Sequence, residues 1–119
     1  MLKSVPELVA NAKASVATLS AADAAKRITN ENDTLLLDVR ETEEHKAGSI
    51  EGAVNIPRGI LEIKISGLAA QPDNPIIIHC AAGGRAVLAA KSLGEMGYNN
   101  VVAVTAGFED LRRAIADLG

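Results

Sequence analysis

Two uninterrupted apolar runs constrain the fold of this chain more than any other feature of its sequence. The stretches "TLLLDV" (34–39) and "IIIHC" (76–80) each contain three consecutive aliphatic residues followed by a polar or ring-bearing one. A strand with one solvated face alternates apolar and polar residues, whereas a strand covered on both faces stays apolar. Both runs are therefore expected to be strands inside a parallel sheet.

Helical patterns lie between the expected strands. Shorter strands are expected at 15–19, 52–57 and 101–107, and helices at 6–14, after Ser20 as an N-cap, and at 41–47, 59–68, 85–97 and 108–119. Strands that alternate with helices form a parallel sheet with helices on both faces. We predict a three-layer α/β/α domain over residues 20–119, with a central, mostly parallel sheet of about five strands. Residues 1–19 are expected to form an N-terminal extension with a short helix and the first strand.

The composition argues against several classes of function. Aromatic residues make up 2% of the chain and its formal net charge is −3, so neither base stacking nor phosphate attraction favours nucleic-acid binding. No stretch approaches the roughly 20 apolar residues of a membrane span. A single cysteine without a signal-peptide pattern leads us to expect a cytoplasmic protein. His45, His79 and Cys80 are too few for a common metal site, and no cofactor is expected.

Polar residues follow three of the expected strands. Asp38, Cys80 and Thr105 each stand where an apolar run ends. In open parallel sheets the functional site lies at the carboxyl ends of the strands. The sequence therefore predicts that these residues share one edge of the sheet, and that this edge carries the site.

The only cysteine precedes a glycine-rich turn. Gly83 and Gly84 allow backbone conformations in which amide groups form a concave anion site, and the following helix and Arg85 add positive charge. This environment favours the thiolate of Cys80, which is the reactive form of a cysteine. A lone cysteine at a strand end is usually a small buried apolar residue, but the Gly-Gly-Arg that follows favours a nucleophile. His79 should point to the opposite face of the sheet, so we expect no neighbouring base.

Three fragments resemble one known family. "LLLDVRETEEHKAGSIEGAVNIP" (35–57) is similar to the Asp-Val-Arg and Gly-Ala-x-Asn-Ile-Pro pattern of single-domain rhodaneses. "IIIHCAAGGRA" (76–86) resembles their active-site loop, and "VTAGFEDL" (104–111) resembles the turn before their last helix. The order and spacing of the fragments also match, over roughly residues 20–116. The resemblance implies the rhodanese-like fold and a sulfurtransferase activity.

In such an enzyme Cys80 would be the nucleophile. It would take the outer sulfur of a small anionic donor such as thiosulfate, become a persulfide, and pass the sulfur to cyanide, a thiol, thioredoxin or another sulfur-accepting protein. The resemblance places the donor's anionic group in the loop formed by Ala81, Ala82, Gly83, Gly84 and Arg85.

Other residues have supporting roles under the same resemblance. Asp38 and Arg40 are expected to form an ion pair or hydrogen bonds that hold loops. Arg58 is expected either to attract anions at the rim or to be a simple solvated charge. Ala86 stands where a hydroxyl residue is common, which removes one hydrogen-bond donor near the start of the helix. Ser49 stands where the family often has His.

Two alternatives remain open from the sequence. One is a non-catalytic binding or regulatory module on the same fold, although such modules commonly lack the cysteine. The other is a cysteine-dependent phosphatase or arsenate reductase, which typically has a longer loop between Cys and Arg than the four residues found here. A phosphatase also needs an acid for the leaving group, and the loop region offers none.

Overall fold

The two apolar runs form neighbouring strands at the centre of the sheet. In the computed structural model, which describes residues 1–119, β2 (Leu35–Asp38) and β4 (Ile76–His79) pair in parallel, with Leu35 opposite Ile76 and Asp38 opposite His79. Every residue of β4 is buried, and so are the last three residues of β2. The register brings the carboxyl ends of both strands to one edge, as predicted.

Three further strands complete the sheet. These are β1 (Ala17–Leu19), β3 (Val54–Asn55) and β5 (Val101–Val104), and the order across the sheet is β1-β5-β4-β2-β3. All four neighbouring pairs are parallel. The prediction of about five strands is confirmed, and the sheet is wholly rather than mostly parallel.

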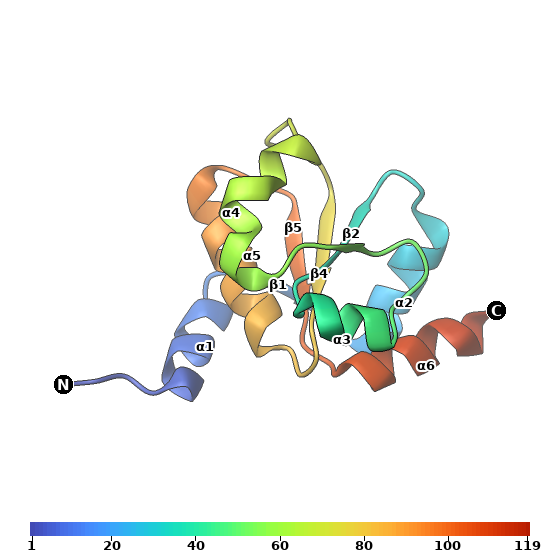
Figure 1. Ribbon diagram of the computed structural model, residues 1–119, viewed down its shortest axis with the longest axis horizontal. Coiled ribbons are helices and arrows are strands. Elements are labelled where there is room, and N and C mark those ends of the chain that lie inside the picture. Colours follow the sequence, from blue (N-terminus) through green and yellow to red (C-terminus); the bar gives the residue numbers. More distant parts are fainter.

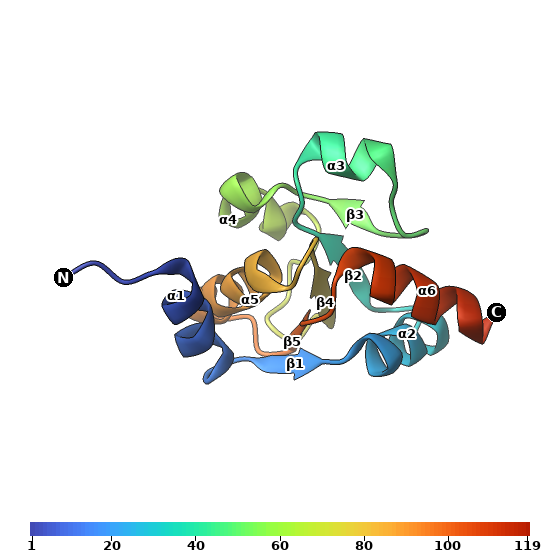
Figure 2. The same ribbon diagram turned by 90° about the horizontal axis from the view of Figure 1, so that it is seen from below.

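Helices cover both faces of the sheet. They are α1 (Val5–Lys13), α2 (Ala21–Asn30), α3 (Thr42–Ala47), α4 (Leu61–Lys64), α5 (Gly84–Met96) and α6 (Phe108–Leu118). One face carries α1, α4 and α5, and the other carries α2 and α6, while α3 lies at the edge near β2 and β3 (Figures 1 and 2). None of these helices combines the length and the apolar character needed to cross a bilayer.

Local signals in the sequence set most helix ends. The hydroxyl of Ser20 accepts a hydrogen bond from the amide of Asp23 at 3.1 Å, which confirms the predicted N-cap of α2. Ser4 and Glu7 form a capping box that starts α1 slightly before the predicted position. The helix predicted over 59–68 is broken, because 3-10 turns at Arg58–Ile60 and Ile65–Gly67 leave only α4 between them.

Alternation along β4 divides the core into two parts. Ile76 and Ile78 pack with Cys80 against α5, α4 and α1, in a cluster of 16 buried residues. Ile77 packs with Leu111 of α6 in a cluster of 7 buried residues on the opposite face. The neighbouring His79 follows the period-two alternation and lies on the face of Ile77. This confirms that His79 and Cys80 point to opposite sides of the sheet.

The N-terminal extension docks on the helix that follows the cysteine loop. Ala12 of α1 is fully buried and belongs to the larger core cluster. A Cβ built on Gly84, at the first position of α5, would lie 3.6 Å from Cγ2 of Val9. Helix α1 is therefore part of the packing that supports the start of α5.

We expect Ala12→Asp to destabilise the protein far more than Ala10→Asp. The carboxylate at position 12 must be buried or must push α1 off the domain, with a loss of about 3 kcal/mol in the free energy of unfolding. Ala10 is exposed on the same helix. The same exchange there costs only helix propensity, about 0.5–1 kcal/mol. Urea denaturation of both variants checks this, and equal losses would contradict the docking of α1.

Candidate active site

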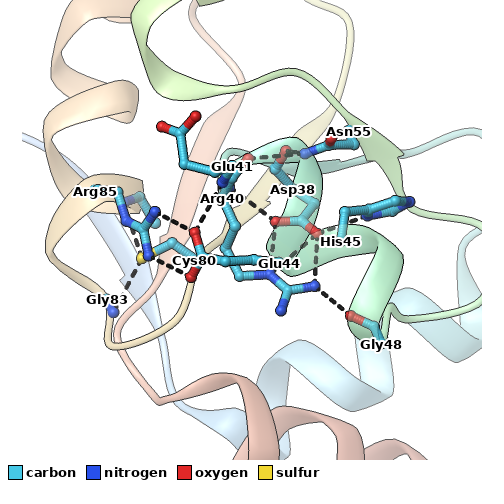
Figure 3. A network of polar contacts seen from close by, with 11 residues as sticks. Asp38, Arg40, Glu41, Glu44, His45, Gly48, Asn55, Cys80, Gly83 and Arg85 are labelled. Carbon is cyan, nitrogen blue, oxygen red and sulfur yellow. Dashed lines mark hydrogen bonds and ion pairs between the residues drawn. The ribbon is translucent and has the colours of Figure 1, made fainter.

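Cys80 lies at the N-terminal end of α5, directly after β4. Its side chain is buried, with an exposed fraction of 1% for the residue. The sulfur Sγ accepts hydrogen bonds from two backbone amides, Gly83 N at 3.1 Å and Ala86 N at 3.3 Å (Figure 3). Donors directed at a sulfur, together with the partial positive end of a helix, stabilise negative charge on it.

Several backbone amides of the loop after Cys80 have no hydrogen-bond acceptor. The backbone N–H groups of Ala81, Ala82, Gly84 and Arg85 donate to no acceptor within the protein. Ala81 and Ala82 are exposed, and Gly84 and Arg85 are half-buried. Unpaired amides at a helix N-terminus are suited to binding an anion that comes close to Sγ.

This turn requires a glycine at position 83, because the backbone there lies against Thr105, the residue that follows β5. Gly83 has a φ of +98°, and a Cβ at this position would lie 2.5 Å from the carbonyl oxygen of Thr105. Nearer the start of the loop, the amide of Phe108 donates to the carbonyl of Ala81 at 3.0 Å. The turn between β5 and α6 therefore contacts the cysteine loop at both Gly83 and Ala81. Thr105 lies at this edge of the sheet, as predicted, and its hydroxyl donates to the carbonyl of Leu19 at 3.4 Å.

Arg85 is paired with an acid from another helix. Its Nη1 and Nη2 donate to Oε1 and Oε2 of Glu44, on α3, at 2.7 and 3.0 Å (Figure 3). The hydrogen bonds from Arg85, and a further one from the amide of Glu41, lower the pKa of Glu44 to about 2. The same pairing raises the pKa of Arg85, with a smaller contribution from the charge of Cys80.

Asp38 is the centre of a second polar network. The fully buried carboxylate accepts from the backbone amide and Nε of Arg40, both at 3.0 Å, and from Nη2 at 2.9 Å. Its Oδ2 also pairs with Nδ1 of His45 at 2.8 Å. Burial opposes ionisation of Asp38, but these hydrogen bonds outweigh it and hold its pKa below the usual value.

The network ties three segments to the end of β2. Nη2 of Arg40 donates to the carbonyl of Gly48 at 2.7 Å, which anchors the end of α3. Nδ2 of Asn55 donates to the carbonyls of Asp38 and Arg40 at 3.0 and 2.9 Å. The Arg40 guanidinium carbon lies 4.0 Å from the ring centre of Phe108, at the start of α6. Asp38 follows Leu36 in alternation, so this network lies on the sheet face opposite to Cys80.

Arg58 is engaged away from the loop. Its Nη1 donates to Oε2 of Glu62 at 2.9 Å, and the same oxygen accepts from Oγ of Ser92, on α5, at 2.5 Å. The guanidinium is still partly exposed, at 28% of the side chain. The contacts show a link between α4 and α5, and a role in attracting anions remains a prediction.

His79 has no polar partner although it is completely buried. Neither ring nitrogen has a hydrogen-bond partner in the protein, and the ring lies 6.1 Å from that of Phe108. Burial lowers the pKa of His79 to about 4. The imidazole is therefore neutral near pH 7 and is held on the face of the sheet away from Sγ.

Several of these contacts could not be read from sequence patterns. Glu44 was visible only as one acid in a charged helix, and Asn55 only as part of a short strand. Phe108 was visible only as the first residue of the helix expected at 108–119. Each of these residues contacts partners that are distant in the sequence, and the register and packing of the sheet bring them together. Only the fragments that resemble the rhodanese family, which contain these residues, could have indicated their importance.

The chain belongs to the rhodanese-like domain family. The model of that family matches residues 20–114, which include the cysteine loop and the Asp38 network but exclude α1 and β1. The adenylyltransferase and sulfurtransferase UBA4 of Meyerozyma guilliermondii is 40% identical over 82 residues, covering 64% of this chain and 19% of that protein. The chain spans less than two thirds of the length of that protein and of two other relatives, of which it covers 61% and 45%.

Solved structures have the same fold over most of this chain. A Rhodopseudomonas palustris protein of unknown function, named as a possible tyrosine phosphatase, aligns with a TM-score of 0.82 and 30% identity over 96% of this chain and 92% of that one. The polysulfide-sulfur transferase homodimer of Wolinella succinogenes aligns with a TM-score of 0.72 and 31% identity, covering 87% and 77%. Both likenesses confirm the three-layer rhodanese-like fold.

We expect Gly83→Ala to disrupt the cysteine loop. The new Cβ would meet the Thr105 carbonyl at 2.5 Å in a conformation with a φ of +98°. A loss of about 3 kcal/mol or more in the free energy of unfolding should follow. Gly52→Ala is the matched control, because Gly52 has a φ of +86° and nothing within 4 Å of its Cβ position. It should lose only about 1–2 kcal/mol, and chemical denaturation compares the two.

Acid should weaken the fold through His79 before it affects the carboxylates. The pKa of His79 falls from 6.5 to about 4 on folding, so the unfolded chain binds more protons between these values and stability falls as the pH drops from 6.5 towards 4. The full effect is about 3 kcal/mol.

His79→Phe should remove most of this slope, because it keeps a ring and deletes the unpartnered nitrogens. Urea denaturation between pH 7 and pH 5 provides the measurement. An unchanged slope in His79→Phe would show that another group titrates in this range. The low pKa values of Asp38 and Glu44 affect stability only at lower pH, where these carboxylates gain protons.

Proposed function

We propose that this protein is a sulfurtransferase that carries a sulfur atom on Cys80. The observation that supports the proposal most directly is the geometry at Sγ, which accepts two amide hydrogen bonds beside a loop of unpaired amides. Membership of the rhodanese-like family and likeness to proteins named as sulfurtransferases point in the same direction. The donor would be a small sulfur anion such as thiosulfate, and the acceptor cyanide, a thiol, thioredoxin or another sulfur-accepting protein.

The reaction would take place in two displacements. The Cys80 thiolate attacks the outer sulfur of thiosulfate, the bond between its two sulfur atoms breaks, and sulfite leaves with that electron pair. The product is a Cys80 persulfide with one negative charge on its terminal sulfur. An acceptor thiolate or cyanide then attacks that sulfur and releases the Cys80 thiolate. No redox partner is required, because the sulfane sulfur passes from one nucleophile to the next.

The loop amides would serve both displacements. In the first they hold the anionic part of the donor, and in the second the negative terminal sulfur of the persulfide. Neutral amides suit both roles because they need no proton transfer. The Asp38 and Arg40 network is proposed to position α3 and the β5–α6 turn rather than to touch the donor. Since a single cysteine cannot form an internal disulfide, we propose a reducing compartment for this chemistry.

A phosphatase activity is the rival suggested by the name of one structural neighbour. It would need a side chain that protonates the leaving group. Glu44 is the carboxyl group fixed beside the loop, and its pKa of about 2 keeps it ionised near neutral pH. The loop also has only four residues between Cys80 and Arg85. Both features favour sulfur transfer over phosphoryl transfer.

We expect thiosulfate to add a single sulfur atom to Cys80. Intact-mass spectrometry after exposure to thiosulfate should show the gain, and cyanide or a thiol should remove it. Cys80→Ser should show neither step, because a hydroxyl is a far weaker nucleophile at neutral pH. Failure to gain sulfur from thiosulfate and from any other sulfane donor would contradict the proposal. Hydrolysis of an aryl phosphate that disappears in Cys80→Ser would favour the phosphatase instead.

A further inference from the structure

Arg85, the cation at the end of the cysteine loop, is already paired with a carboxylate. Both terminal nitrogens of the Arg85 guanidinium donate to Glu44, at 2.7 and 3.0 Å. These two nitrogens form one of the planar pairs of N–H donors with which a guanidinium grips an oxyanion. A donor that approached Sγ would meet an ion pair rather than a free positive charge.

Glu44 is held firmly in this position. Its Oε1 also accepts from the backbone amide of Glu41 at 2.9 Å, which completes the capping box at the start of α3. Moving the carboxylate would therefore break bonds to Arg85 and uncap a helix. The charge of Glu41 also acts on Arg85. The Arg85 guanidinium is thus acted on by the negative charges of both Glu44 and Glu41.

We propose that Glu44 determines donor specificity by withholding Arg85 from the donor. The inference rests on the proposed sulfur transfer. With Arg85 neutralised, an incoming anion is held by the uncharged amides of the loop and is repelled by the carboxylates of α3. The cost of this repulsion grows with the charge of the donor. The site therefore favours sulfane-sulfur donors with one negative charge over dianions such as thiosulfate.

A pair of donors of similar size isolates the effect of charge. Thiosulfate carries two negative charges, and the methanethiosulfonate anion has a methyl group in place of one oxygen and carries one. In both, the Cys80 thiolate attacks the terminal sulfur and the bond between the two sulfur atoms breaks. Thiosulfate releases sulfite, methanethiosulfonate releases methanesulfinate, and both leave the same Cys80 persulfide. The ratio of their kcat/KM values therefore measures how strongly the site prefers a donor with one negative charge over a donor with two.

We expect Glu44→Gln to shift this ratio towards thiosulfate. The amide preserves the shape and one acceptor for Arg85 but removes the negative charge. The ratio of kcat/KM for thiosulfate to that for methanethiosulfonate should rise about five- to tenfold at low ionic strength and should fall back as salt is added. Glu44→Asp, which keeps the charge, should leave the ratio near that of the wild type.

The matched control is Glu43→Gln. Glu43 lies next to Glu44 on α3, has a side chain that is 87% exposed, and forms an ion pair with Lys46 at 3.7 Å. The Glu43→Gln substitution removes the same charge from the same helix without affecting the partner of Arg85. The ratio of kcat/KM for the two donors should therefore change less than twofold. If Glu44→Gln lowers kcat/KM for both donors equally, Glu44 only holds the loop and the specificity proposal is overturned. If neither donor forms a persulfide on the wild-type protein, the proposed function itself fails.

Discussion

The close approach of Gly83 to the Thr105 carbonyl is the constraint on which the site depends. It lets the chain leave β4, turn with a φ of +98°, and start α5 so that two amides point at Sγ. A side chain at Gly83 would push the loop, and with it the first turn of α5, away from Thr105, which follows β5. The backbone of one glycine thus links the sheet, the unpaired loop amides and Cys80.

Two ionic systems at the same edge of the sheet have different roles. The Asp38 network is buried, lies on the face opposite to Cys80, and joins the end of β2 to α3 and the start of α6. The pair of Glu44 and Arg85 is partly exposed and joins α3 to the loop itself. Because both systems hold α3, a change in the buried network would reach the cysteine loop through Glu44 without any direct contact.

The fold could be predicted from the sequence because its signals are local. Uninterrupted aliphatic runs indicated β2 and β4. Ser20 indicated the start of α2 through a hydrogen bond to a residue only three positions further along the chain. The position of Cys80 followed from the end of a strand and a pair of glycines. The pairing of Glu44 with Arg85, 41 residues apart, depends on how α3 sits against α5, and no pattern within either helix encodes it. The broken helix around α4 had the same cause, since its isoleucines are suited to either helix or strand and packing decides between them.

Ala86 shows how backbone geometry changes the meaning of a substitution. The sequence suggested that an alanine here removes a donor, because a hydroxyl is common at this position in the family. In the structure the residue still donates to Sγ through its backbone N–H at 3.3 Å, and its side chain is fully buried. All the direct hydrogen bonds to the sulfur therefore come from the main chain. Their directions are set by the start of α5 and not by a rotatable side chain, so the hydrogen-bonding environment of the sulfur depends on the rigidity of the loop.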